Sequence, residues 1–103
     1  MTVPETNINR EHIFNVLRRF KELNAERYHI ISLGFFGSGA RDQCNEKSDV
    51  DVVVVLNEPD IFRLIGIKQD LEEEFQCHVD IVRYRERMNP FLRRRIEREA
   101  IYV

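Results

Sequence analysis

The chain has 103 residues, of which 43% are hydrophobic and 33% are charged. This composition is typical of a folded globular protein and excludes a disordered chain. The length suits one hydrophobic core, so we expect residues 1–103 to form a single domain. No apolar run approaches the roughly 18 residues that a membrane span needs, and the N-terminus lacks a signal-peptide pattern. We therefore expect a soluble protein of the cytoplasm, with Cys44 and Cys77 as reduced thiols.

The formal net charge of −2 conceals a basic segment near the C-terminus. Residues 83–98 contain seven arginines and two glutamates, which gives this segment a charge of +5. Such a segment could contact an anionic partner, either a nucleotide or a nucleic acid, or it could form a solvated helix face. A dedicated nucleic-acid-binding protein is usually basic overall, and this chain is not. A role in binding nucleic acid therefore stays open.

The N-terminal part of the chain shows the pattern of a helix followed by a strand. Asn9 is a suitable N-cap, and apolar residues recur at helical spacing from there to about Arg27. Residues 30–36 are typical of a strand, which Gly37-Ser38-Gly39 ends. A short helical turn is expected over residues 40–43.

The clearest strand covers residues 50–56, which are apolar on both faces once the aspartates are passed. Two apolar faces indicate an interior strand that is covered on both sides. Four further elements are expected in chain order: a helix capped by Asp60 and running to about Gln76, a strand over 78–82, a helix that begins at Asn89-Pro90, and a short edge strand over 100–103.

This order of helices and strands predicts an α/β (α+β) fold in one domain. The segment between the first two strands is too short for a full helical crossover, so that pair of strands is expected to be antiparallel. The result is a small mixed sheet with helices beside it.

Gly37-Ser38 lies directly after a predicted strand and before the predicted turn. Glycine lets the backbone approach a phosphate closely, a serine hydroxyl can donate to phosphate oxygens, and helix N-terminal amides favour anions. A Gly-Ser pair is a weak signal by itself, because most such pairs only make turns. It gains meaning from the acidic residues that follow.

Three aspartates stand in or beside strands that are otherwise apolar. Period-two alternation puts Asp49 and Asp51 on one face of their strand, where two carboxylates repel each other unless a cation lies between them. Oxygen ligands of this kind suit magnesium or manganese. Burying the charged carboxylate of Asp80 within its apolar strand costs free energy unless the group is paired, exposed at the edge of the sheet or bound to metal. If the two strands are neighbours, the three carboxylates could hold two metal ions about 3.5–4 Å apart, with Asp80 as metal ligand and general base.

Together these residues resemble a known motif. Gly37-Ser38, followed by ten residues and Asp49-x-Asp51, resembles the GS-x10-DxD motif of the polymerase-beta-type nucleotidyltransferase superfamily. Segments 37–41 and 48–54 are similar to its minimal nucleotidyltransferase branch, and the resemblance extends over nearly the whole chain. It therefore implies a polymerase-beta-like nucleotidyltransferase fold.

The resemblance also implies roles for individual residues. Gly37 and Ser38 would bind the triphosphate of a nucleoside triphosphate. The catalytic, metal-binding acids would be Asp49, Asp51 and Asp80, holding Mg²⁺, with two ions expected and Mn²⁺ as an alternative. One departure from the pattern is Asp42, which stands where many relatives have glycine and leaves the loop shape and the role of Arg41 open.

A partner protein is implied as well. Minimal nucleotidyltransferases commonly pair with helical HEPN proteins, usually ribonuclease toxins, and act as their antitoxins. The implied reaction is transfer of AMP from ATP to a tyrosine hydroxyl of such a toxin. A chain this short has no second lobe, so we expect another chain to complete the acceptor site. Two alternatives stay open: an antitoxin that acts by binding alone with a vestigial site, and a small-molecule nucleotidyltransferase, although relatives of the latter kind carry additional helical structure.

The three histidines, His12, His29 and His78, are not spaced as a metal site. We expect surface or packing roles for all three, including His78, which shares a strand face with Asp80.

Overall fold

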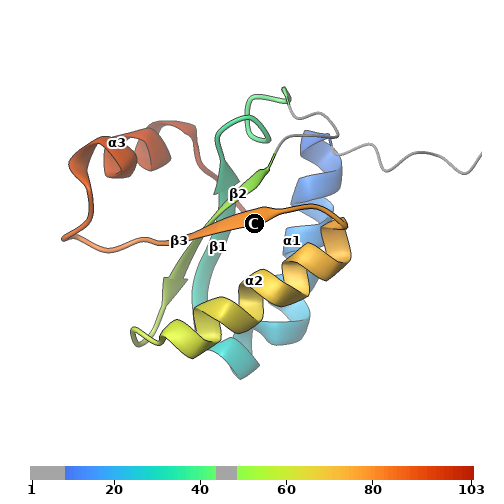
Figure 1. Ribbon diagram of the computed structural model, residues 1–103, viewed down its shortest axis with the longest axis vertical. Coiled ribbons are helices and arrows are strands. Elements are labelled where there is room, and N and C mark those ends of the chain that lie inside the picture. The colour runs from blue at the N-terminus through green and yellow to red at the C-terminus, as the bar shows by residue number, and fades with distance from the viewer. Residues whose placement is uncertain (1–8, 44–48) are drawn as a thin grey trace, which may run out of the picture.

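Figure 1 shows the computed structural model of the protein, in which residues 9–43 and 49–103 are described. Cys44 and Ser48 lie outside these ranges. The elements, in chain order, are α1 (Arg10–Tyr28), β1 (Ile30–Phe36), β2 (Val50–Leu56), α2 (Ile61–Phe75), β3 (Val79–Arg83), α3 (Pro90–Glu99) and β4 (Ile101–Tyr102).

Each of the long helices and strands predicted from the sequence is present, with its boundaries shifted only slightly. Residues 37–42 form hydrogen-bonded turns, in which the Arg41 N–H donates to the Gly37 carbonyl oxygen at 3.1 Å, where a short helical turn was predicted over 40–43. Within the described ranges, no helix is both long enough and apolar enough to cross a membrane.

The strands of the described residues form one four-stranded sheet in the order β3-β2-β1-β4. β1 runs antiparallel to β2, as the short link between these strands predicted, and it also runs antiparallel to β4. β2 and β3 are parallel, and α2 supplies the crossover that parallel strands require. The mixed sheet of the predicted α/β (α+β) fold is therefore confirmed.

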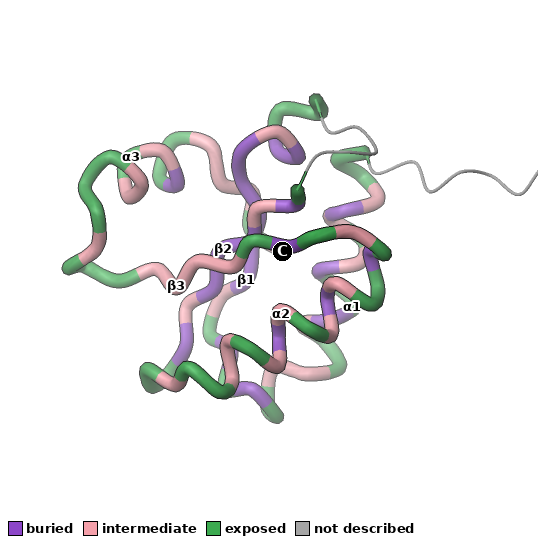
Figure 2. The backbone as a smooth tube through the Cα atoms, in the orientation of Figure 1, coloured by how far each residue is buried: buried purple, intermediate pink, exposed green. Residues whose placement is uncertain are grey.

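β2 is apolar on both faces because helices cover both sides of the sheet. Val52 and Val54 face the main core, in which residues of α1 and α2 pack against the sheet. Val53 points to the opposite side and packs with Phe36 and with Ile96 of α3. Figure 1 shows the same division, with α1 and α2 on one side of the sheet and α3 on the other. The buried residues gather along β1 and β2, as Figure 2 shows.

The predicted helix N-caps are confirmed. The side chains of Asn9, Asp60 and Asn89 each accept hydrogen bonds from backbone N–H groups in the first turn of the helix that follows. α1 and α2 end at residues in the left-handed conformation, His29 with φ 56° and Gln76 with φ 55°. Because glycine usually fills this position, neither C-cap had a clear signal in the sequence.

β4 ties the end of α3 to the sheet. Tyr102 pairs with Gly34 of β1, and Ile101 pairs with Phe35. A Cβ atom at Gly34 would lie 2.6 Å from the carbonyl oxygen of Ile101, so the strands approach this closely only because residue 34 is glycine. Since α3 ends at Glu99, directly before β4, this pairing also fixes the position of the last turn of α3.

We expect Gly34→Ala to destabilise the protein by about 1–3 kcal/mol, since the added methyl group meets a backbone carbonyl that cannot turn away. Gly66→Ala is the comparison, because a Cβ there lies 3.0 Å from the Tyr28 ring and so meets a side chain rather than a backbone carbonyl. That variant also gains about 1 kcal/mol of helix propensity. Thermal melts of both variants decide the matter, and equal melting temperatures would contradict the role given to Gly34.

Candidate functional site

The parallel pairing of β2 and β3 brings the three predicted acids together. Asp51 lies directly opposite Asp80 in the register, so both side chains leave the same face of the sheet. Asp49 precedes Asp51 by two residues and therefore points the same way, with 50% of its side-chain surface exposed. Val53 and Val82 continue the same alternation and pack with α3. The carboxylates therefore lie on the side of the sheet that α3 covers.

The carboxyl group of Asp51 is costly to ionise. Burial is the largest cause that raises its pKa above the ordinary value, and the negative charge of Asp80 is the second. Arg95 and Arg41 lower this pKa and Asp49 raises it, but the net shift of the Asp51 pKa is upward. A cation bound among these carboxylates would favour the ionised form.

His78 lies beside the carboxylates of Asp49 and Asp80, which together with Asp51 form the acid cluster of the site. Its Nδ1 atom is 3.5 Å from Oδ1 of Asp49 and 3.7 Å from Oδ1 of Asp80. Its Nε2 atom is 4.0 Å from Oε2 of Glu72 on α2. Ligand atoms of Asp49, His78 and Asp80 all lie within 4.8 Å of one another, an arrangement that could hold a metal ion. The sequence predicted a surface or packing role for His78, and its side chain is 53% exposed beside these carboxylates.

Gly37 turns the chain at the end of β1 and contacts the acid cluster. Its φ of 70° is a left-handed conformation that favours glycine. A Cβ atom at this position would collide with the Asp51 carboxylate and would lie 3.1 Å from Nη2 of Arg95. The turn is closed by the N–H of Gln43, which donates to the Ser38 carbonyl oxygen at 2.8 Å. The loop of Gly37 and Ser38 therefore lies beside Asp51.

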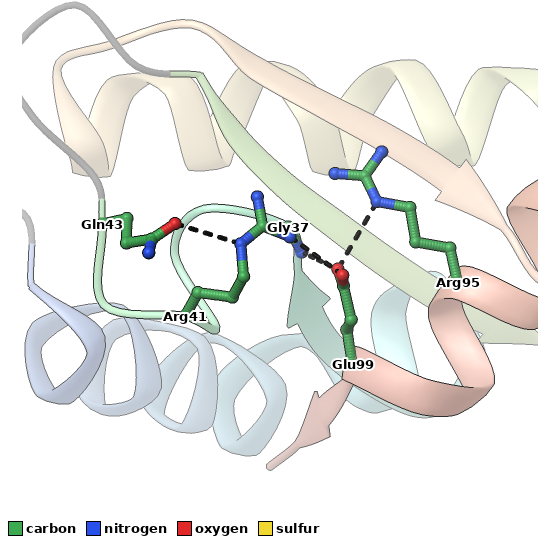
Figure 3. A network of polar contacts seen from close by, with 5 residues as sticks. All are labelled: Gly37, Arg41, Gln43, Arg95 and Glu99. Atoms are coloured by element: carbon green, nitrogen blue, oxygen red, sulfur yellow. Dashed lines mark hydrogen bonds and ion pairs between the residues drawn. The ribbon is translucent and has the colours of Figure 1, made fainter.

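Figure 3 shows a polar network between this loop and the end of α3, centred on the Glu99 carboxylate. The Gly37 N–H donates to Oε2 of Glu99 at 3.2 Å. Arg41 donates from Nη1 to Oε1 at 2.9 Å, and Nε of Arg95 lies 3.4 Å from Oε2. Arg41 is also held by Gln43, whose Oε1 accepts from its Nε at 3.2 Å. Burial acts to raise the pKa of Glu99, but Arg41, the Gly37 N–H and Arg95 together lower it below the ordinary value. The carboxylate therefore stays ionised.

The arginines of α3 divide between the surface and this network. Arg93 forms an ion pair with Glu97 at 2.9 Å. Arg94 lies over the ring of Phe91, which is 76% exposed. Arg95 instead extends toward the loop that follows β1. Arg93, Arg94 and Arg95 therefore contact three different sets of partners.

Sequence reasoning did not single out His78, Arg95 or Glu99 for this site. The one usable signal for His78 was its position two residues before Asp80, on the same face of a strand. An arginine and a glutamate four residues apart on a helix are typical of a surface ion pair, so Arg95 and Glu99 carried no distinguishing signal.

Asp51→Asn should stabilise the protein in the presence of a chelator. Because folding raises the pKa of Asp51, its ionised form opposes folding, and stability is regained as the pH falls through the folded-state pKa. We expect the variant to melt at or above the wild-type temperature at neutral pH, with the difference shrinking toward about pH 4, near the unfolded-state pKa. Glu58→Gln, on the exposed turn after β2, is the control. A lower melting temperature for Asp51→Asn at neutral pH would instead indicate a carboxylate held by structural hydrogen bonds.

Comparison with known proteins connects this geometry to a family. The nucleotidyltransferase domain family matches residues 17–103. The chain is 35% identical over 92 residues to MJ0128 of Methanocaldococcus jannaschii, provisionally named a protein adenylyltransferase, and the match covers 88% of this chain and 94% of that protein. It is 31% identical over 94 residues to the protein adenylyltransferase MntA of Thermococcus cleftensis, covering 90% of this chain and 94% of MntA.

Solved structures share the fold. A provisionally named minimal nucleotidyltransferase superposes with a TM-score of 0.75 at 31% identity, covering 90% of this chain and 94% of that one. A chain from the complex of tri-AMPylated Shewanella oneidensis HEPN toxin with MNT antitoxin superposes with a TM-score of 0.58 at 18% identity, covering 95% and 71%, which is a likeness of fold alone. Since the family match includes the Gly37 loop, all three aspartates and α3, this chain belongs to the nucleotidyltransferase domain family and is an enzyme of the nucleotidyltransferase type.

Proposed function

We propose that this chain is a metal-dependent protein adenylyltransferase, which transfers AMP from ATP to a hydroxyl group of a partner protein. The observation that carries the proposal is the register that sets Asp51 opposite Asp80, with Asp49 on the same face and Gly37 in contact. Nucleotidyl transfer requires the acceptor, the metal and the triphosphate to bind side by side. The aspartates offer oxygen ligands for the metal, and the adjoining Gly37 loop offers a place for the triphosphate.

The donor set fits a divalent cation. Asp49, Asp51 and Asp80 offer carboxylate oxygens, the ligands that Mg²⁺ and Mn²⁺ prefer. Burial and the charge of Asp80 raise the pKa of Asp51 in spite of Arg95 and Arg41, and a cation bound among the carboxylates would favour the ionised form. When bound, such ions neutralise charge on the triphosphate and lower the pKa of the acceptor hydroxyl. Two Mg²⁺ ions are proposed, with Mn²⁺ as the alternative.

The chain's own groups have distinct tasks in this scheme. The Gly37 backbone and the Ser38 hydroxyl bind the triphosphate. Asp80, whose side chain is 50% exposed, accepts the proton of the acceptor hydroxyl as general base. The hydroxyl oxygen then forms a bond to the α-phosphorus of ATP, and the bond from that phosphorus to the bridging oxygen breaks. Pyrophosphate leaves, and AMP stays attached to the partner.

The proposed partner is a helical HEPN-type toxin, with a tyrosine hydroxyl as the acceptor and this chain as its antitoxin. Two comparisons support this choice: MntA, which is similar in sequence, is a protein adenylyltransferase, and a chain of similar fold comes from a complex of an AMPylated HEPN toxin with an MNT antitoxin. A cytoplasmic location, where ATP and magnesium are available, is part of the same proposal.

The reaction is tested by mass spectrometry of a helical HEPN-type protein that forms a complex with this chain, after incubation with ATP and magnesium. The partner should gain mass in AMP-sized steps with the wild-type chain and with Glu58→Gln, a control at the far end of β2. Asp80→Asn should reduce the rate by at least about a hundredfold, since both a metal ligand and the base are lost. Full modification by Asp80→Asn would contradict its assigned role. Neutralisation of the toxin without any mass gain would favour an antitoxin that acts by binding alone.

The contribution of His78 is tested by metal binding in solution. An imidazole nitrogen suits Mn²⁺ better than Mg²⁺, so His78→Ala should weaken Mn²⁺ binding by about tenfold and Mg²⁺ binding much less. His29→Asn is the matched control, because asparagine tolerates the left-handed conformation of residue 29. Calorimetric titrations with each ion give the affinities. An equal loss of affinity for both ions would mean that the imidazole is not a metal ligand and affects binding only through the carboxylates beside it.

A further inference from the structure

We propose that Glu99 is an internal anion occupying the place at the Gly37 amide that a phosphate oxygen of the nucleoside triphosphate takes. On this view Arg41 and Arg95 are the cations that bind the triphosphate, and nucleotide binding exchanges Glu99 for phosphate. The inference rests on the proposed function, and it adds three residues that lie outside the Gly-Ser and Asp-x-Asp positions.

The first support is the set of donors around Glu99. A backbone N–H from a left-handed glycine and two guanidinium groups converge on one carboxylate, at 3.2 Å from Gly37, 2.9 Å from Arg41 and 3.4 Å from Arg95. Backbone N–H groups in such turns and the planar donors of arginine are the groups that proteins use to bind phosphate. A carboxylate oxygen and a phosphate oxygen accept hydrogen bonds from the same positions.

The second support is the position of Arg95 between the loop and the acid cluster. Its Nη2 atom lies 3.1 Å from the point that a Cβ on Gly37 would occupy, and the Asp51 carboxylate adjoins the same point. Its guanidinium carbon lies 5.6 Å from the ring centroid of Phe36, which supports the group from the side of the sheet. The Arg95 guanidinium therefore adjoins both the loop and Asp51, within reach of a triphosphate that contacts the two.

The third support is the charge balance of the network. One Glu99 carboxylate faces two arginines, so these three groups together carry a charge of +1, with the Asp51 carboxylate beside Arg95. Glu99 is also the last residue of α3, where the helix dipole disfavours an anion. Its contacts with the two arginines offset this disadvantage. A triphosphate carries several negative charges and competes with a single carboxylate for the same donors.

Sodium tripolyphosphate, without metal or nucleoside, is the probe that isolates this site, and calorimetry gives its affinity. We expect Arg95→Ala and Arg41→Ala each to weaken tripolyphosphate binding by about tenfold, the effect of losing one charge-assisted contact. Arg94→Ala is the matched control, because Arg94 lies on the same helix and its guanidinium packs on Phe91. The affinity of this variant for tripolyphosphate should equal that of the wild type.

Glu99→Gln distinguishes two roles of Glu99: an anion that competes with phosphate, or a side chain that only stabilises the contact between α3 and the Gly37 loop. The amide keeps an acceptor for the Gly37 N–H but removes the negative charge, so tripolyphosphate should bind several-fold more tightly to this variant than to the wild type. If Glu99 only stabilises this contact, the variant should melt at a lower temperature and bind tripolyphosphate equally or more weakly. Should Arg95→Ala not fold, Arg95→Gln at the same position tests the same loss of charge.

The outcomes for this inference and for the proposed function are distinct. Absence of tripolyphosphate binding to the folded wild type, equal affinity of the wild type and the Arg95 variants, or no gain in Glu99→Gln would each overturn the inference, even with AMP transfer intact. Arginine-dependent binding that tightens in Glu99→Gln would support it, even if no partner is modified and the proposed function fails.

Discussion

The parallel register between β2 and β3 orients the acidic side chains of the site. β2 is held from both faces, by Val52 and Val54 in the main core and by Val53 in the smaller cluster beneath α3. A slip of one residue would move these valines out of their clusters and turn Asp51 into the main core. The same burial of apolar surface that stabilises the sheet therefore keeps Asp51 opposite Asp80.

The clustering of the aspartates opposes folding unless a cation binds among them. Burial and the charges of Asp80 and Asp49 raise the pKa of Asp51, so its ionised form opposes folding. A domain of this size buries a modest fraction of its surface and has a small net stability. Sites built for ligands commonly give up stability in this way, and a ligand that binds only the folded state restores it.

The C-terminal part of the chain completes the charge environment of the site. α3 covers the face that bears the carboxylates, and β4 fixes its end through the close pairing of Tyr102 with Gly34. Arg95 and Glu99 thereby reach the loop at Gly37, where the arginine lies between the loop and the acids. The aspartates of the site thus come from β2, from the residue before it and from β3, whereas α3 supplies the Arg95 guanidinium and the Glu99 carboxylate that contacts it.

The sequence by itself determined the helices and strands, the main caps and the pair of Asp49 and Asp51, because alternation along a strand and hydrogen bonds at a helix end are local properties. It also identified Asp80 as an acid out of place in an apolar strand. Only the tertiary structure decided that Asp80 lies opposite Asp51, and that the carboxylate of Glu99 meets the amide of Gly37, 62 residues away in the chain. These contacts depend on which strands pair and on where α3 packs, and such choices follow from burial summed over the whole core rather than from any local pattern.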